Sequence, residues 1–352
     1  MTSLNTLQEH LKQITPPNTA LQEQAAEREY YLAKPRGSLG RLETLACQLA
    51  SIQNNSRLRH KHKLMVVCAG DHGVTEEGVS PYAKEVTYQQ ILNFQKGFGA
   101  ITVLSRTADV KVQLLDVGVD YDFPALPHLI AKKIAKGTKN LSKGPAMTRE
   151  EAIQSILTGL EVVLAEPYVD LVAAGEMGIG NTTPSSCISI VYTGLSPEES
   201  TGRGSGLSGE LVRHKVEIIK RALEINKPDP SDPIDVLAKV GGLEIGAMCG
   251  VYLGGAIRKA GVIIDGFIGA AAALLAAKLC PNIKSYLIAG HKSKEKAHSA
   301  VLDFLGLKPL LDLDMWLGEG SGAAIAMFIA ECACTHFNEM RTMDEAAIKD
   351  II

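Results

Sequence analysis

The chain has 352 residues, of which 46% are hydrophobic and 21% are charged, and its formal net charge at pH 7 is −3. These values are ordinary for a globular protein, and the length suits one large domain or two smaller ones. The small net charge, the lack of a concentrated run of Lys and Arg and the single Trp argue against a nucleic-acid partner.

Two further features bear on where the protein works. The N-terminal residues lack the basic-then-apolar layout of a secretory signal, and the apolar stretch at 268–277 is too short and too rich in Ala and Gly to span a bilayer. The seven cysteines are odd in number and most have apolar neighbours, which is typical of reduced, buried thiols. We therefore expect a soluble, cytoplasmic protein with no membrane contact.

The first 60 residues are predicted to be helical. Spaced apolar positions favour helices over 8–14, 18–32 and 41–52, and the stretch 34–40, which contains Pro and Gly, separates the last two. The helical C-terminus could pack back on these helices as a small second domain.

Beyond residue 60, apolar runs alternate with helical patterns. These runs are predicted strands and lie at 64–69, 110–120, 169–174, 261–266 and 285–290. The first is continuously apolar, which is typical of a strand buried on both faces of a parallel sheet. Helices are predicted at 86–104, 149–165, 184–192, 208–226, 235–240, 243–260, 268–279, 293–306 and 323–340. This alternation predicts an α/β domain with a mostly parallel sheet.

Polar or glycine-rich sequence follows four of the predicted strands, at 70–73, 175–178, 265–266 and 290–293. Ligands bind at the carboxyl ends of the strands in open parallel sheets, so we expect a site there. The stretch 175–183 is the strongest candidate, because its glycines expose N–H groups ahead of a helix N-terminus, which favours an anion such as a phosphate monoester. This stretch matches neither a Walker loop nor G-x-G-x-x-G. The alternative to an anion site is that it only forms a tight turn and the N-cap of the next helix.

Other residues could bind the same anion or act on a substrate. Arg203–Gly206 forms a second glycine-rich turn, Lys215 could supply a charge and Ser293 a hydroxyl; the alternative for each cation is a solvated helix face. Glu319 is a lone acid in the glycine-rich stretch 317–324, where it could act on a substrate or simply face solvent.

Asp71 and His72 invite a metal or general-base interpretation. The chain does not supply further ligands at the usual spacing, and it has no G-x-S-x-G elbow that would favour a hydrolase. We therefore expect hydrogen-bonding or structural roles for both residues.

Together, these motifs resemble the nicotinate-nucleotide–dimethylbenzimidazole phosphoribosyltransferase family of cobalamin lower-ligand synthesis. The matching stretches run in family order along nearly the whole chain, at 34–43, 70–74, 77–80, 86–89, 93–94, 175–183, 265–268 and 317–324. The resemblance implies transfer of phosphoribosyl from nicotinate mononucleotide to 5,6-dimethylbenzimidazole. The products are α-ribazole 5′-phosphate and nicotinate, with inversion at the anomeric carbon, and neither a cofactor nor a metal is implied.

The resemblance also implies a fold and an assembly. Residues 61–324 are expected to form a Rossmann-like catalytic domain, with a mostly parallel sheet flanked by helices. Residues 1–60 together with 325–352 are expected to form a small helical domain built from both chain ends. The protein is expected to be a homodimer.

Individual residues receive roles from the same resemblance. Glu319 matches the general base that takes the proton from the benzimidazole nitrogen, and Glu176 matches a second active-site acid. The phosphate cradle is matched by Gly178, Gly204, Lys215 and Ser293. The base pocket and its apolar walls are matched by Ser80, Gln89, Met177 and Leu317, with Gly318 beside them. A leucine is the more usual wall at the position of Met177, and a Met wall is more adaptable.

Two alternatives stay open at this point. One is a related enzyme that moves phosphoribosyl to another acceptor, such as adenine or a phenol. The other is a non-catalytic nucleotide-binding protein, which would most simply have lost the base, whereas Glu319 is present.

Overall fold

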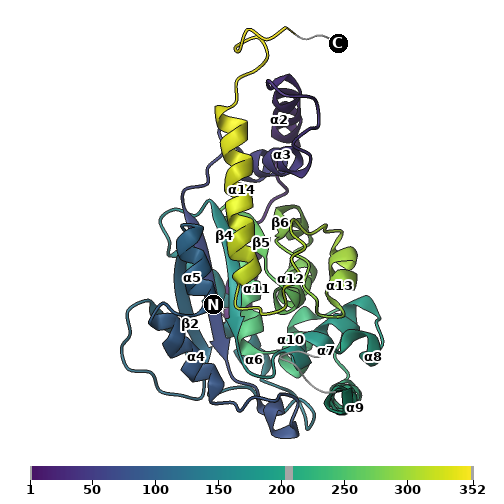
Figure 1. Cartoon of the computed structure of the whole chain (residues 1–352). Helices are drawn as coiled ribbons and strands as arrows, with labels where there is room; N and C mark the ends of the chain where they lie inside the picture. The colour runs from purple at the N-terminus through teal and green to yellow at the C-terminus, as the bar shows by residue number, and fades with distance from the viewer. Residues whose placement is uncertain (1, 203–208, 350–352) are drawn as a thin grey trace.

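A six-stranded sheet organises the fold (Figure 1), which we describe from a computed structural model that covers residues 2–202 and 209–349. The strands are β1 (Lys63–Gly70), β2 (Lys111–Gly118), β3 (Leu129–Ala131), β4 (Leu171–Met177), β5 (Gly261–Ile264) and β6 (Leu287–Ala289). Their order is β3-β2-β1-β4-β5-β6, and every neighbouring pair is parallel. The predicted α/β fold is confirmed, and the strand order reverses between β1 and β4, which is where such sheets bind ligands.

Alternate residues of each strand point to opposite faces, and each face has its own apolar core. On β1, Leu64, Val66 and Cys68 belong to one core, whereas Met65 and Val67 belong to the other. This two-residue period is that of an extended chain buried on both sides. It explains why the sequence of β1 is continuously apolar.

Helices cover both faces. The first face is covered by α1 (Ser3–Leu11), α6 (Arg149–Leu164), α7 (Thr182–Thr193), α9 (Gly209–Asn226), α10 (Pro233–Val240), α11 (Leu243–Ile257), α12 (Phe267–Leu279) and α13 (His298–Leu305). The second face is covered by α3 (Arg41–Gln53), α4 (Val86–Gln95), α5 (Ala100–Thr107) and α14 (Ser321–Glu339), with α2 (Thr19–Tyr31) packed on α3. Short helices are α8 (Pro197–Ser200) and the 3-10 turns η1 (Gly73–Glu77) and η2 (Pro281–Tyr286). Within the described ranges, no helix combines the length and apolar character needed to cross a membrane.

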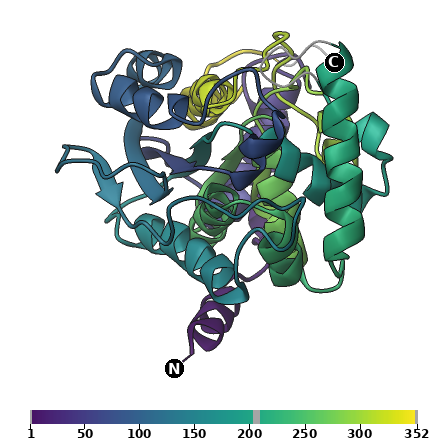
Figure 2. The same ribbon diagram turned by 90° about the horizontal axis from the view of Figure 1, so that it is seen from below.

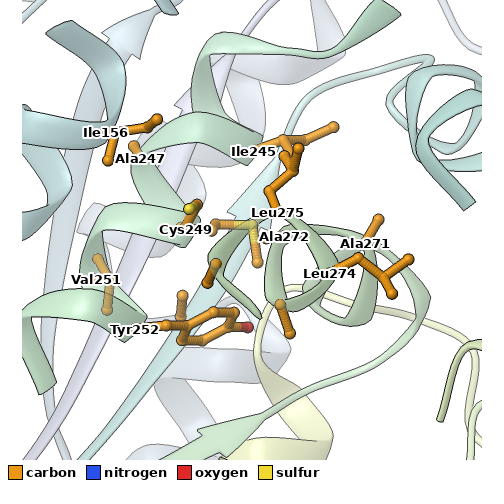
Figure 3. Close-up of a cluster of buried hydrophobic side chains, with 14 of the residues drawn as sticks. Ile156, Ile245, Ala247, Cys249, Val251, Tyr252, Ala271, Ala272, Leu274 and Leu275 are labelled. Atoms are coloured by element: carbon orange, nitrogen blue, oxygen red, sulfur yellow. The ribbon is translucent and has the colours of Figure 1, made fainter. Parts of the chain in front are cut away.

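Helix α11 is buried on all sides between α6, α12 and the sheet. Figure 3 shows side chains of α11, such as Cys249 and Tyr252, interleaved with Ala272 and Leu275 of α12. The backbones of α6 and α11 come very close, because a Cβ added at Gly250 would lie 1.9 Å from the Ile156 carbonyl oxygen. This tight layer forms a rigid floor beneath β1 and β4.

The two ends of the chain meet at α14. Helices α2 and α3 lie beside the C-terminal half of α14 (Figure 1), and the Arg28 guanidinium donates 3.1 Å hydrogen bonds to the carbonyl oxygens of Phe337 and Met340. Helix α1 packs instead on α6 (Figure 2). A separate small domain with the boundaries expected from the sequence stays a prediction.

Two local expectations are corrected by the structure, and two short elements were not expected. The single helix expected at 86–104 is two helices, because the chain turns at Gly97, whose φ is +81°. The helix expected from Ser293 begins only at His298, since the Ser293 N–H donates to the Nδ1 atom of His298 (2.8 Å) and holds the preceding segment as a loop. Strand β3 and helix α8 were not expected from the sequence.

Candidate active site

A cavity of about 320 Å³ opens at the carboxyl ends of β4 and β5, and β4 is one of the two strands between which the strand order reverses. Its walls come from α4, the β4–α7 loop, α9, the start of α12, the loop after β6 and the turn before α14. Of the residues predicted from the sequence, those that line it are Ser80, Glu176, Met177, Gly178, Lys215, Ser293, Leu317, Gly318 and Glu319. The structure therefore brings together stretches that are far apart in the chain.

Glu319 lies in a turn of unusual backbone conformation. Gly318, Glu319 and Gly320 have φ values of +85°, +63° and +89°. Glycine adopts this left-handed region easily, whereas a glutamate there is uncommon and strained. The turn lies directly on β4, because a Cβ at Gly175 would be 2.3 Å from the Glu319 carbonyl oxygen. Such strain at a cavity wall points to a functional constraint on Glu319.

Two buried carboxylates hold the backbone of this turn. The Glu319 N–H donates to Oε1 of Glu176 (3.0 Å), which comes from the end of β4. The Gly320 N–H donates to Oδ2 of Asp265 (3.2 Å), and the Ala323 N–H donates to Oδ1 of the same side chain (2.9 Å). Asp265 directly follows β5. The turn is thus fixed from two neighbouring strands.

The Glu319 side chain is only 6% exposed, so it does not face bulk solvent. Its Oε1 accepts a hydrogen bond from Nε2 of Gln90 (3.0 Å), while Oε2 has no hydrogen-bond partner among the described residues. Burial raises the pKa of Glu319, the Asp265 carboxylate raises it further, and the Gln90 amide opposes them. A carboxylate with a raised pKa and a vacant oxygen is suited to accept a proton.

Glu176 is a second buried acid on the same wall. Burial is the main cause that raises its pKa to about 7, and the neighbouring Glu319 and Glu244 carboxylates add to the effect. The Glu319 N–H and the side-chain amide of Asn181, which donates to Oε2, oppose it. Close acids with raised pKa values are typical of catalytic sites.

Cationic and hydroxyl groups also line the cavity. Lys215 is 1% exposed, and its Nζ donates to the Thr182 hydroxyl (2.5 Å) at the N-terminus of α7. Burial lowers the pKa of Lys215 to about 8, although Glu295 favours its charged form. Ser293 is buried and lines the same cavity, and Gly178 precedes α7. An ammonium, a hydroxyl and a helix N-terminus together favour a bound anion.

Comparisons with known proteins identify the family of the chain. A family model described as Phosphoribosyltransferase matches residues 14–348. The chain belongs to this phosphoribosyltransferase family. Proteins named nicotinate-nucleotide–dimethylbenzimidazole phosphoribosyltransferase from Desulforudis audaxviator (strain MP104C) and Geotalea uraniireducens (strain Rf4) are 47% and 46% identical to the chain, over 98% and 99% of both sequences. The crystal structure of CobT from Thermus thermophilus superposes with a TM-score of 0.90 at 43% identity, covering 94% of this chain and 99% of that chain.

Two predicted residues are not placed in the cavity of this phosphoribosyltransferase. Gln89 is exposed on α4, whereas Gln90, the next residue, lines the cavity and contacts Glu319. The inward face of α4 carries the buried Thr87 and Ile91, and a helix of 3.6 residues per turn puts Gln90 on that face. Gly204 lies outside the described residues.

Some residues of the cavity were missed by sequence reasoning. The sequence marks Asp265 only as a polar residue after a strand. Its two backbone hydrogen bonds are made to a turn about 55 residues later in the chain, which the sequence does not show. Trp316 and Tyr82 line the cavity while remaining 57% and 52% exposed, and the sequence carries no local signal for this.

The hydrogen-bonding roles expected for Asp71 and His72 are seen in the structure. Asp71 accepts from the Asp120 N–H, and His72 hydrogen-bonds to Glu244 (both 2.8 Å).

Removal of the Glu176 carboxylate is expected to change how stability depends on pH. The folded-state pKa of about 7 lies above the ordinary value of 4.5, so the folded protein binds this proton more tightly than the unfolded chain does. The resulting contribution to the free energy of unfolding is complete below about pH 4.5 and is lost as the pH rises through 7. The free energy of unfolding changes by roughly 3 kcal/mol over this range. Glu176→Gln should therefore gain stability relative to the wild type between about pH 5 and about pH 8 in urea unfolding.

The exposed Glu161 on α6 provides the control for this measurement, since Glu161→Gln also removes one carboxylate. Wild-type and Glu176→Gln unfolding free energies that change in parallel with pH would contradict the raised pKa.

Proposed function

We propose that this phosphoribosyltransferase moves phosphoribosyl from nicotinate mononucleotide to 5,6-dimethylbenzimidazole. The products are α-ribazole 5′-phosphate, for the nucleotide loop of cobalamin, and nicotinate. The names of the relatives support these substrates. The structural observation that carries the proposal is one cavity with the buried, half-partnered Glu319 carboxylate on one wall and the Lys215 ammonium on another.

The chemistry of the transfer matches these groups. One nitrogen of the benzimidazole attacks the anomeric carbon, and the bond from that carbon to the pyridinium nitrogen breaks. The electron pair of this bond returns to the pyridine ring, which leaves as a neutral ring and needs no acid. The proton on the other benzimidazole nitrogen must then be accepted by a base, and we assign this role to Glu319.

The remaining residues would bind and orient the two substrates. Lys215, Ser293 and the backbone at Gly178 would hold the phosphate. Ser80, Met177, Leu317 and Gly318 would line the pocket for the flat acceptor ring, with Gln90 in place of the expected Gln89. Glu176 would stabilise positive charge that develops on the ribosyl group. Holding two rings on either side of one carbon is itself a large contribution to rate.

An acceptor panel tests the substrate assignment. The protein is incubated with nicotinate mononucleotide and equimolar 5,6-dimethylbenzimidazole, adenine and a phenol, and the products are identified by mass. The α-ribazole 5′-phosphate is expected to dominate. A dominant adenine or phenol product would assign the chain to a related transfer, and binding of nicotinate mononucleotide without any release of nicotinate would favour a non-catalytic nucleotide-binding protein.

We further propose that the protein acts as a cytoplasmic homodimer, as the family resemblance implies. Exposed apolar side chains on neighbouring parts of the second face support a self-association surface: Phe98 and Val103 near and on α5, and Phe328 on α14. The unpaired cysteines are compatible with a reducing compartment.

A further inference from the structure

We propose that Asp265 is a positioning residue that keeps Glu319 in the conformation needed to accept the acceptor's proton. This inference rests on the function proposed above for Glu319. Asp265 is 3% exposed, and both of its carboxylate oxygens accept backbone N–H groups, those of Gly320 (3.2 Å) and Ala323 (2.9 Å). Gly320 is the residue directly after Glu319.

Helix α14 needs this contact because it has no cap of its own. Its N-cap position is Gly320, which has no side chain to accept the free N–H groups of the first turn. Asp265 reaches this turn from the end of β5 and supplies a carboxylate where the helix dipole favours a negative charge. The helix start is thereby fixed to the sheet, and Glu319 is fixed with it.

The strained backbone of Glu319 shows what the contact achieves. A glutamate with a φ of +63° would relax to an ordinary conformation unless its neighbours held it. Glu176 holds its N–H on one side, and Asp265 holds the next N–H on the other side. Because the carboxylates come from the adjacent strands β4 and β5, a shift of either would turn the Glu319 side chain away from Gln90 and the cavity.

The arrangement requires a carboxylate rather than an amide. An asparagine in place of Asp265 would keep one oxygen acceptor, but its amide nitrogen would face a backbone N–H, so one of the two hydrogen bonds would be lost. His291 also lies near this carboxylate, but its Nε2 is 3.7 Å from Oδ1, beyond hydrogen-bond distance. The effect of Asp265→Asn should therefore reach the reaction through the turn and Glu319.

A double-mutant cycle separates this role from direct contact with substrate, which is the rival because Asp265 also lines the cavity. Asp265→Asn is expected to lower kcat about 10- to 100-fold with little change in the KM for nicotinate mononucleotide. In a Glu319→Gln background, the same change should lower the residual kcat less than about 3-fold, because the group it positions is already disabled. Equal factors in both backgrounds would overturn the proposal.

Amide hydrogen exchange tests the same contact without any turnover. Asp265→Asn should speed exchange at least about 10-fold at whichever of the Gly320 and Ala323 amides loses its hydrogen bond, whereas the exposed Asp303→Asn on α13 should change neither. Unchanged exchange at both amides would also overturn the proposal. If the asparagine variant does not fold, Asp265→Glu keeps the charge and is expected to retain more activity than Asp265→Ala. A wild type without nicotinate release would refute the proposed function, while the exchange result would still decide whether Asp265 holds the turn.

Discussion

Replacement of Glu319 by glutamine is expected to lower turnover by about 10²-fold or more while leaving the binding of nicotinate mononucleotide intact. Glutamine has the same shape and can still accept the hydrogen bond from Gln90, so the fold and the cavity should persist. It cannot take up a proton at neutral pH, and the vacant Oε2 that we assign to this task becomes an amide. Steady-state kcat and calorimetric titration with the nucleotide measure the two parts of this expectation.

The exposed Glu339 near the end of α14 gives the matched control, and Glu339→Gln should behave as the wild type. A Glu319→Gln variant with unchanged kcat would rule out the general-base role. A variant that loses nucleotide binding as well would indicate that Glu319 supports the cavity rather than the proton transfer.

Substitution of Lys215 by methionine is expected to raise the KM for nicotinate mononucleotide about 10- to 100-fold. A charge-assisted hydrogen bond to a phosphate contributes about 1.5–3 kcal/mol, and each 1.4 kcal/mol is a factor of ten. The ammonium is buried beside Thr182, and its pKa of about 8 leaves it mostly charged at neutral pH. For the same reason, nucleotide affinity of the wild type should weaken as the pH rises above 8, and that pH dependence should disappear in the variant.

The unfolding temperature of the Lys215→Met protein shows whether a raised KM comes from lost phosphate binding or from a destabilised fold. Burial of an ammonium disfavours the folded state, so methionine, which keeps the apolar stem, should not lower the unfolding temperature. Lys220→Met changes a more exposed lysine on the same helix and serves as the control. An unaltered KM in Lys215→Met would remove this residue from the phosphate site.

Much of the fold was predictable because its strands are buried on both faces. Apolar runs located β1, β4, β5 and β6, and the polar stretches after these strands located the site. Strand β3 has only three residues and is held by pairing with β2, with His128 before it at a φ of +63°, so its own sequence carries almost no signal. Short edge strands of this kind depend on tertiary contacts rather than on local pattern.

In the site, too, local motifs were predictable from the sequence, whereas contacts between distant parts of the chain were not. Glycines and a lone acid identified the turn around Glu319, but a sequence cannot show that Asp265 and Glu176 bind its backbone, because these contacts bridge separate strands. That Gln90 rather than Gln89 lines the cavity could have been inferred from the sequence. The buried positions Thr87 and Ile91 set the inward face of α4, and the helical period then selects Gln90.

The most direct test of the account is the identity and stoichiometry of the products. The protein is incubated with nicotinate mononucleotide and 5,6-dimethylbenzimidazole, and the ribosyl product is examined by NMR while nicotinate is quantified. We predict one nicotinate released for each α-ribazole 5′-phosphate formed, with the α configuration at the anomeric carbon. Absence of nicotinate release, or a product with the β configuration, would contradict the assignment of this cavity as the site of an inverting phosphoribosyl transfer.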